Sequence, residues 1–314
     1  MMHPAQVRIV EVGPRDGLQS ESRAVPVEQR VQLIDMLSAS GLACIEAGSF
    51  VSARSVPQMS QSDLVMRGIR RVPGTHYPVL VPNVIGLERA IAAGADEIAV
   101  FLSATEAFSQ RNINCSIGTS LVRAAEIARI AHEHSMRVRG YVSCTLGCPY
   151  EGAVPLSTVV NVAARLSQLG CYEISLADTI GVGTPRKAQE MVKAVAEAVP
   201  VNRLAIHFHD TFGQALANVL ACLEAGVSVV DSAVGGLGGC PHATGASGNL
   251  ATEDLLYRLD GLGVTSGVDM DRLLDAVEFL ETGLEIRARS KLYAARRRNR
   301  TAAERQRPLK GGLT

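Results

Sequence analysis

The chain has 314 residues, 47% of them apolar, and its 31 Lys and Arg residues balance 31 Asp and Glu residues. This composition allows one large hydrophobic core, no apolar run reaches the roughly 20 residues of a membrane helix, and the zero net charge gives no indication of nucleic-acid binding. The seven cysteines are scattered without metal-ligand spacing, which is typical of free thiols in a reducing compartment.

Short apolar runs alternate with amphipathic segments along the chain. The first run begins almost at the N-terminus with no leader pattern before it, so we expect a cytoplasmic protein without a signal peptide. The apolar runs predict strands over residues 7–12, 43–50, 77–82, 97–104, 137–144, 171–177, 203–208 and 227–234. Helical spacing and glycine stops predict helices over residues 27–40, 60–70, 87–94, 119–135, 158–170, 185–199, 213–226 and 250–263.

Three local signals refine these boundaries. Ser157 is predicted to cap the helix that follows it, and Pro185 is expected in the first turn of its helix. Residues 108–116 (FSQRNINCS) are predicted to form a loop.

Eight strand–helix units over about 260 residues predict a (β/α)8 TIM barrel. A doubly wound open sheet is the alternative, but the pattern GxGxxG does not follow the first strand. Residues 268–295 add helix beyond the barrel, so we expect one catalytic domain over residues 1–295. From Ile286 onward ten Lys and Arg residues face a single acid, Glu304, and residues 296–314 are predicted to be a disordered basic tail.

The stretch IHFHDTFGQALAN (206–218) carries the first chemical signal. His207 and His209 are two residues apart at the end of a predicted strand, so both side chains point to the same face. In most proteins such a pair is one exposed and one backbone-bonded histidine. In a barrel, however, the carboxyl ends of all strands meet at one mouth, where Asp16 could supply a carboxylate and Asn249 a neutral oxygen. That set of ligands suits Mg²⁺, Mn²⁺ or Zn²⁺.

Other polar residues are expected at the same mouth. Arg15 is placed either to stabilise a developing oxyanion or to form a salt bridge with Glu46 or Asp178. The loop GGLGGCPHATGASG (235–248) could cradle phosphate or close as a lid carrying Cys240. Cys144 and Cys148 have no second cysteine pair nearby, so we interpret them as structural.

Taken together, the motifs GPRDGLQ, RGYVSC, LGCPYEG, CYEISLADTIGVGTP, HFHDTFGQALAN and GLGGCP resemble those of the 3-hydroxy-3-methylglutaryl-CoA lyase family. The resemblance covers residues 7 to about 290. It implies cleavage of an acyl-CoA substrate to acetyl-CoA and acetoacetate by a retro-Claisen reaction that depends on Mg²⁺ or Mn²⁺. It also implies a homodimer.

The resemblance assigns roles by motif match. The metal ligands would be Asp16, His207, His209 and Asn249. Arg15 would stabilise the enolate, and Cys240 would take part in proton transfer. The chemistry also requires a general base for the hydroxyl proton, and Asp178 and His207 are the candidates. Glu46 and Asp178 match acidic residues that members of the family keep in the catalytic site. The residues expected to bind substrate are Arg15, Gln19, Ser49 and Ser143.

The chain also departs from the family pattern. It has Ala47–Gly48 within EAGSF, Ser55 in place of an aromatic residue, Ser22 in place of a Lys and His242 in place of a Tyr. Smaller side chains near the acyl group would favour a longer 3-hydroxy-3-alkylglutaryl-CoA.

Three other functions are compatible with these motifs. A condensing synthase of the same superfamily normally has a longer chain, and a barrel amidohydrolase normally carries its HxH motif on the first strand. A non-catalytic barrel that only binds CoA or metal would not need Arg15, Cys240 and both histidines together.

Overall fold

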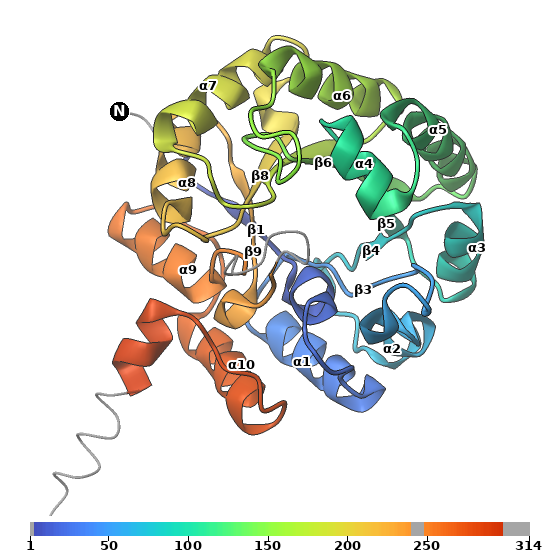
Figure 1. The fold of residues 1–314 in the computed structure, drawn as a ribbon. Coiled ribbons are helices and arrows are strands. Elements are labelled where there is room, and N and C mark those ends of the chain that lie inside the picture. Colours follow the sequence, from blue (N-terminus) through green and yellow to red (C-terminus); the bar gives the residue numbers. More distant parts are fainter. Residues whose placement is uncertain (1–2, 240–247, 298–314) are drawn as a thin grey trace, which may run out of the picture.

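The computed structural model describes residues 3–239 and 248–297. Parallel strands form a ring at its centre, and helices surround that ring (Figure 1). The strands are β1 (Arg8–Glu11), β2 (Cys44–Ile45), β3 (Gly48–Ser49), β4 (Val79–Leu80), β5 (Glu97–Ser103), β6 (Arg137–Ser143), β7 (Glu173–Asp178), β8 (Leu204–Phe208) and β9 (Val229–Ser232). Each one falls inside a predicted strand or within one residue of it.

The barrel closes through the second predicted strand, which is split into β2 and β3. β2 pairs with β1 and β3 pairs with β4, so the two ends of the sheet are consecutive in the chain. At the break, the Glu46 amide donates to Glu11 O at 2.8 Å and the Ala47 amide donates to Pro78 O at 2.9 Å. The predicted eight-unit barrel is therefore confirmed, with one strand interrupted at Glu46.

The helices are α1 (Val27–Ala39), α2 (Ser62–Gly68), α3 (Val84–Ala92), α4 (Glu106–Ile113), α5 (Ile117–Glu133), α6 (Leu156–Gln168), α7 (Pro185–Ala196), α8 (Ala215–Glu224), α9 (Thr252–Gly261) and α10 (Met270–Thr282). Short helical turns are η1 (Gly13–Gly17), η2 (Pro57–Met59), η3 (Val201–Arg203) and η4 (Val234–Gly236). The apolar core fills the space between strands and helices, as both faces of a parallel sheet require. Of the described helices, none is long and apolar enough to span a membrane.

Two local predictions were wrong. Residues 108–113 of the predicted loop belong to α4, a short helix that packs against β5 and α5 with Phe108 buried beneath it. Ser157 does not cap α6, because the helix already begins at Leu156, directly after Pro155. Pro185 does occupy the first position of α7.

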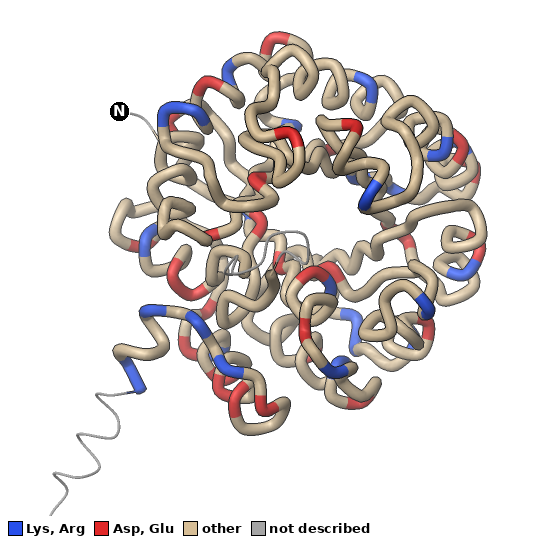
Figure 2. Tube along the Cα trace, in the orientation of Figure 1, with Lys and Arg blue, Asp and Glu red and all other residues tan. Residues whose placement is uncertain are grey.

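Charged residues of both signs cover the outer helices, and others lie on the strands inside the ring (Figure 2). Beyond α10 the chain runs back toward η4. There the Arg289 amide donates to Gly235 O at 2.7 Å and its guanidinium donates to Gly238 O at 2.6 Å. Residues 291–297 are helical. The rest of the predicted basic tail, residues 298–314, lies outside the described residues.

Candidate active site

A cavity of about 380 Å³ opens at the carboxyl ends of the strands. On one side it is lined by Arg15 and Asp16 of η1 and by the two histidines at the end of β8. On the other side it reaches α4 and α5, where Asn112 and Arg123 line it. The cavity therefore joins the predicted metal site to the helix that the sequence did not reveal.

Asp16, His207 and His209 come together as predicted. The Nε2 atoms of both histidines lie 3.9 Å from Asp16 Oδ2. One ligand atom from each residue can be chosen so that all lie within 4.8 Å of one another. Among the residues that the structure describes, no other group of His, Cys, Asp and Glu could hold a metal ion in this way.

The protonation states of this cluster suit a divalent cation. Burial opposes ionisation of Asp16, but Arg15 and the two histidines outweigh it and lower the pKa of Asp16 to about 2. Burial, reinforced by His207, lowers the pKa of His209 to about 4. At neutral pH the cluster thus offers a carboxylate and a neutral imidazole, the forms in which these side chains bind metal. The donor set fits a hard or borderline cation.

Asn249 lies against this cluster. Its amide nitrogen donates to Asp16 Oδ2 at 2.9 Å and to Leu237 O at 3.0 Å. Asn249 also forms a backbone bridge with His209. With its nitrogen engaged in this way, Oδ1 is the one side-chain atom that Asn249 could offer a cation.

Arg15 forms one of the salt bridges considered for it, with Glu46, and also lines the cavity. Its Nε donates to Glu46 Oε2 at 2.7 Å and its Nη1 donates to Asp16 Oδ1 at 2.6 Å, while the side chain lines the cavity. Burial alone would lower the pKa of Arg15, but Glu46 and Asp16 raise it well above its usual value. The salt bridge therefore holds a permanent positive charge at the cavity wall. Asp178 is not its partner.

Tyr141 on β6 is a cavity residue that sequence reasoning missed. Its ring lies between two guanidinium groups, with Arg15 Cζ 5.6 Å and Arg139 Cζ 4.8 Å from the ring centroid. Its hydroxyl lies 3.4 Å from Glu46 Oε2. Burial raises the pKa of Glu46, opposed by Arg15, and its Oε1 has no partner in the described structure.

Asp178 lies at the end of β7 but does not line the cavity. Its carboxylate accepts from the Val182 amide at 3.2 Å and from the Gly183 amide at 2.7 Å. Burial raises the pKa of Asp178, opposed by these backbone donors. The side chain therefore orders the loop after β7, and its role as a general base stays a prediction.

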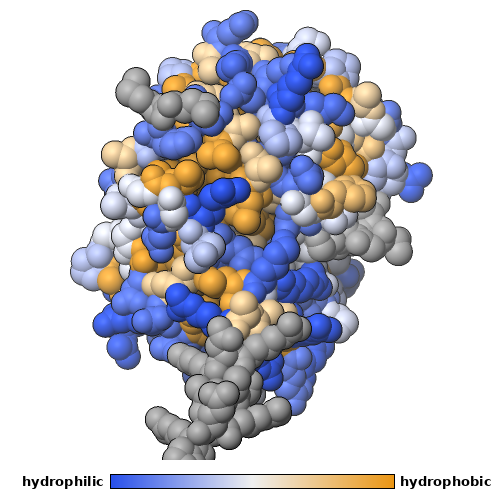
Figure 3. All heavy atoms as spheres, turned by 90° about the vertical axis from the view of Figure 1, so that its left-hand side faces the viewer, coloured by the Kyte–Doolittle hydropathy of each residue, from blue (hydrophilic) through white to orange (hydrophobic). Residues whose placement is uncertain are grey.

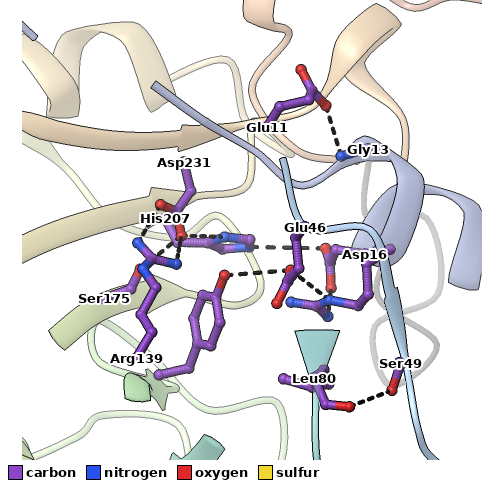
Figure 4. A network of polar contacts seen from close by, with 12 residues as sticks. Glu11, Gly13, Asp16, Glu46, Ser49, Leu80, Arg139, Ser175, His207 and Asp231 are labelled. Carbon is purple, nitrogen blue, oxygen red and sulfur yellow. Dashed lines mark hydrogen bonds and ion pairs between the residues drawn. The ribbon is translucent and has the colours of Figure 1, made fainter. Parts of the chain in front are cut away.

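The predicted substrate-binding residues divide into two groups. Gln19 and Ser143 line the cavity beside Arg15. Ser49 does not, because its hydroxyl donates to Leu80 O at 3.4 Å (Figure 4). Cys240 and His242 lie outside the described residues. Cys144 and Cys148 are both buried.

Of the described residues that depart from the family pattern, some line the cavity and others do not. Ser55 lines the cavity, whereas Ala47 and Gly48 do not. A β carbon on Gly48 would lie 2.8 Å from Ser62 Oγ of α2, so this glycine serves the packing of α2 on the barrel wall. The expectation that Ala47–Gly48 opens room for a longer acyl group was therefore wrong.

Charged residues inside the barrel were also missed. Glu11 accepts from the Gly13 amide at 2.7 Å and the Val234 amide at 2.9 Å, and Asp231 contacts His207. Each of these acids is a buried charge in a strand that is mainly apolar, and that charge was the available signal.

Comparisons with known proteins agree with this geometry. Residues 6–280 match a family model described as HMGL-like. The chain is 55% identical to the mitochondrial hydroxymethylglutaryl-CoA lyase of Gallus gallus over 292 residues, which cover 93% of this chain and 98% of the relative. It is 54% identical to the cytoplasmic 3-hydroxy-3-methylglutaryl-CoA lyase of Mus musculus, with 93% and 85% covered.

A solved structure of hydroxymethylglutaryl-CoA lyase from Pseudomonas aeruginosa superposes with a TM-score of 0.93 at 53% identity, covering 95% of this chain and 100% of that one. The carboxyl transferase domain of Rhizobium etli pyruvate carboxylase shares the fold alone, with a TM-score of 0.67 at 20% identity over 88% of this chain and 47% of that one. The matched family model and the relatives that align over nearly the whole chain place this protein in the HMGL-like family, among the hydroxymethylglutaryl-CoA lyases.

Proposed function

We propose that the chain cleaves 3-hydroxy-3-methylglutaryl-CoA to acetyl-CoA and acetoacetate with the help of Mg²⁺ or Mn²⁺. The observation that carries the proposal is the cluster of Asp16, His207 and His209 at the barrel mouth, with Arg15 beside it. The identity to named lyases over 93% of the chain supports the same reaction.

The reaction needs a base, an acid and a cation from the site. A base takes the proton of the C3 hydroxyl, the C2–C3 bond breaks, and its electron pair forms an enolate on the thioester. An acid then returns a proton to C2. Asp16, His207, His209 and Asn249 would hold the cation, which when bound polarises the hydroxyl and lowers its pKa.

Arg15 fits the stabilisation of the enolate. Its guanidinium is buried, permanently charged and fixed by Glu46, so no reorganisation is needed as negative charge develops beside it. Gln19 and Ser143 would orient the substrate from the same wall of the cavity. Ser49 would affect the substrate only indirectly, by holding the backbone of β4 through its hydrogen bond to Leu80 O.

Three side chains are candidates for the base. If His207 ligates the metal through Nε2, it has no free lone pair for base catalysis. Asp178 already accepts two backbone hydrogen bonds. Glu46, whose Oε1 has no partner in the described structure, is a third candidate for the base. We assign the acid to Cys240.

The test is a panel of acyl-CoA substrates incubated with chelator-treated protein, with and without metal, and products detected by mass. We expect acetyl-CoA and acetoacetate only when Mg²⁺ or Mn²⁺ is added. Full activity after thorough chelation would contradict the metal assignment. Release of CoA from acetyl-CoA and a 2-oxo acid would instead indicate a condensing synthase.

A second candidate is a lyase for a longer 3-hydroxy-3-alkylglutaryl-CoA. Ser52 and Ser55 supply small side chains to the cavity wall after β3, beside Val51 and Val56. If these residues make room, Ser55→Phe should lower kcat/KM for the longer substrate more than for the methyl one. Equal losses for both would exclude this explanation.

The remaining properties are also proposals. Residues 1–295 would form one catalytic domain followed by the basic tail. The protein would act in the cytoplasm, although relatives include both cytoplasmic and mitochondrial enzymes.

We also propose that the protein forms a homodimer, which would need an apolar contact face. On the side formed by α7, α8 and α9, hydrophobic areas lie between hydrophilic ones (Figure 3). Phe212, just before α8, and Tyr257 of α9 are 66% and 67% exposed.

A further inference from the structure

A second layer of charge lies beneath the candidate metal cluster, deeper in the barrel. Asp231 on β9 pairs in register with His207 on β8, and its Oδ2 lies 3.3 Å from His207 Nδ1 (Figure 4). The other ring nitrogen of His207, Nε2, is the one that faces Asp16. Asp231 and His207 are both buried.

The Asp231 carboxylate is itself held in place. Arg139 Nη2 donates to Oδ1 at 2.6 Å, Arg139 Nη1 donates to Oδ2 at 3.1 Å, and Ser175 Oγ donates to Oδ2 at 2.8 Å. Arg139 is fixed in turn, because its Nε donates to Glu173 Oε1 at 2.7 Å. A bidentate guanidinium contact leaves the carboxylate little freedom to rotate.

The Asp231 carboxylate determines the tautomer of the His207 imidazole. A carboxylate accepts only, so His207 must carry its hydrogen on Nδ1, and the lone pair of Nε2 then points into the cavity. His209 provides the contrast, since its Nδ1 is buried without a hydrogen-bond partner in the described structure. The two histidines of the cluster are therefore supported differently.

We propose that Asp231, held by Arg139, is a positioning residue that fixes the His207 imidazole with Nε2 toward the metal. The proposal rests on the metal site put forward above. Carboxylates in this relation to a ligating histidine typically contribute 10- to 100-fold to metal affinity.

Asp231 could instead serve only as a counter-ion that keeps Arg139 buried. Glu173 provides a control that distinguishes positioning of His207 from a counter-ion role toward Arg139. It is equally buried and pairs with the same guanidinium, but it has no contact with His207. Glu173 also pairs with Arg8, so Glu173→Gln removes at least as much ion pairing as Asp231→Asn.

The experiment measures Mn²⁺ binding to the substrate-free protein by the electron paramagnetic resonance signal of free Mn²⁺. We expect Asp231→Asn to weaken Mn²⁺ binding about 10- to 100-fold. Glu173→Gln, which does not touch a ligand, should change it by less than about threefold. Equal weakening in both variants, or unchanged binding in Asp231→Asn, would overturn the proposal. If the wild-type protein binds no Mn²⁺, the proposed metal site fails instead.

A second measurement needs no Asp231 variant and so stands even if that variant does not fold. Long-range ¹H–¹⁵N spectra of the metal-free wild-type protein, with His207 assigned by its loss in His207→Gln, report which ring nitrogen is protonated. We expect the pattern of an Nδ1–H imidazole. An Nε2–H pattern would overturn the proposal.

Discussion

At the scale of single residues, Arg15 combines a structural and a chemical task. It holds Glu46 and Asp16 by charged hydrogen bonds and still faces the cavity. Arg15→Gln should lower kcat about 10²- to 10³-fold, because one preorganised donor to the enolate is lost. Mn²⁺ binding measured on the same variant is the control and should persist, since Asp16 and both histidines remain. A rate close to that of the wild type would contradict the role assigned to Arg15.

Tyr141 allows its ring and its hydroxyl to be tested separately. The hydroxyl contact with Glu46 is long, at 3.4 Å, whereas the ring lies between Arg15 and Arg139. Buried cation–π contacts are worth about 2 kcal/mol each. Tyr141→Leu should therefore lower both kcat and the melting temperature, while Tyr141→Phe should change kcat less than about tenfold. Equal loss of kcat in the two variants would show that the hydroxyl takes part in the chemistry.

At the scale of elements, α9 supports the turn η4 through one buried acid. Glu253 Oε2 accepts from the Gly235 amide at 3.1 Å, and Oε1 has no partner in the described structure. Burial raises the pKa of Glu253 from 4.5 to about 8. Between those two pH values the folded protein keeps a proton that the unfolded chain loses, so the contribution of Glu253 to stability falls as pH rises.

Glu253→Gln removes that proton exchange while keeping an oxygen for the Gly235 amide. The variant should gain in urea midpoint over the wild type as pH rises from about 5 to about 8.5, with little difference at the acid end. Glu88→Gln on the exposed side of α3 controls for the change in charge. A difference that stays constant across this range would contradict the assignment.

The elements also show which features the sequence can predict. The outer helices and buried strands follow apolar periodicity, because they pack on one continuous core. The helix α4 has only eight residues, and Phe108, Asn112 and Ile113 on its inner face line the cavity. The sequence therefore has no continuous apolar stripe there from which a helix could be predicted. The break between β2 and β3 depends on hydrogen bonds to two different strands, which no local pattern encodes.

The site shows the same division. Asp16, His207 and His209 were predictable because polar residues that end barrel strands meet at one mouth. Asp231, Arg139 and Tyr141 were not identified, because they lie within strands and their partners are 24 to 95 residues away in the chain. A charge within an apolar strand signals that a partner exists, but only the closed barrel shows which residue it is.

At the scale of the whole molecule, a metal that joins β8 to η1 should stabilise the folded barrel. A ligand that binds only the folded state adds about 2.7 kcal/mol at a hundredfold excess over its Kd. Adding Mn²⁺ to chelator-treated protein should therefore raise the melting temperature, and the rise should saturate with concentration. His209→Gln is the sharpest comparison, because His209 Nδ1 makes no hydrogen bond in the described structure and its loss should disturb the fold least. We expect this variant to melt close to the metal-free wild type and to gain little from Mn²⁺. A full Mn²⁺-dependent shift in His209→Gln would mean that the cation binds elsewhere and that the barrel mouth is not the metal site.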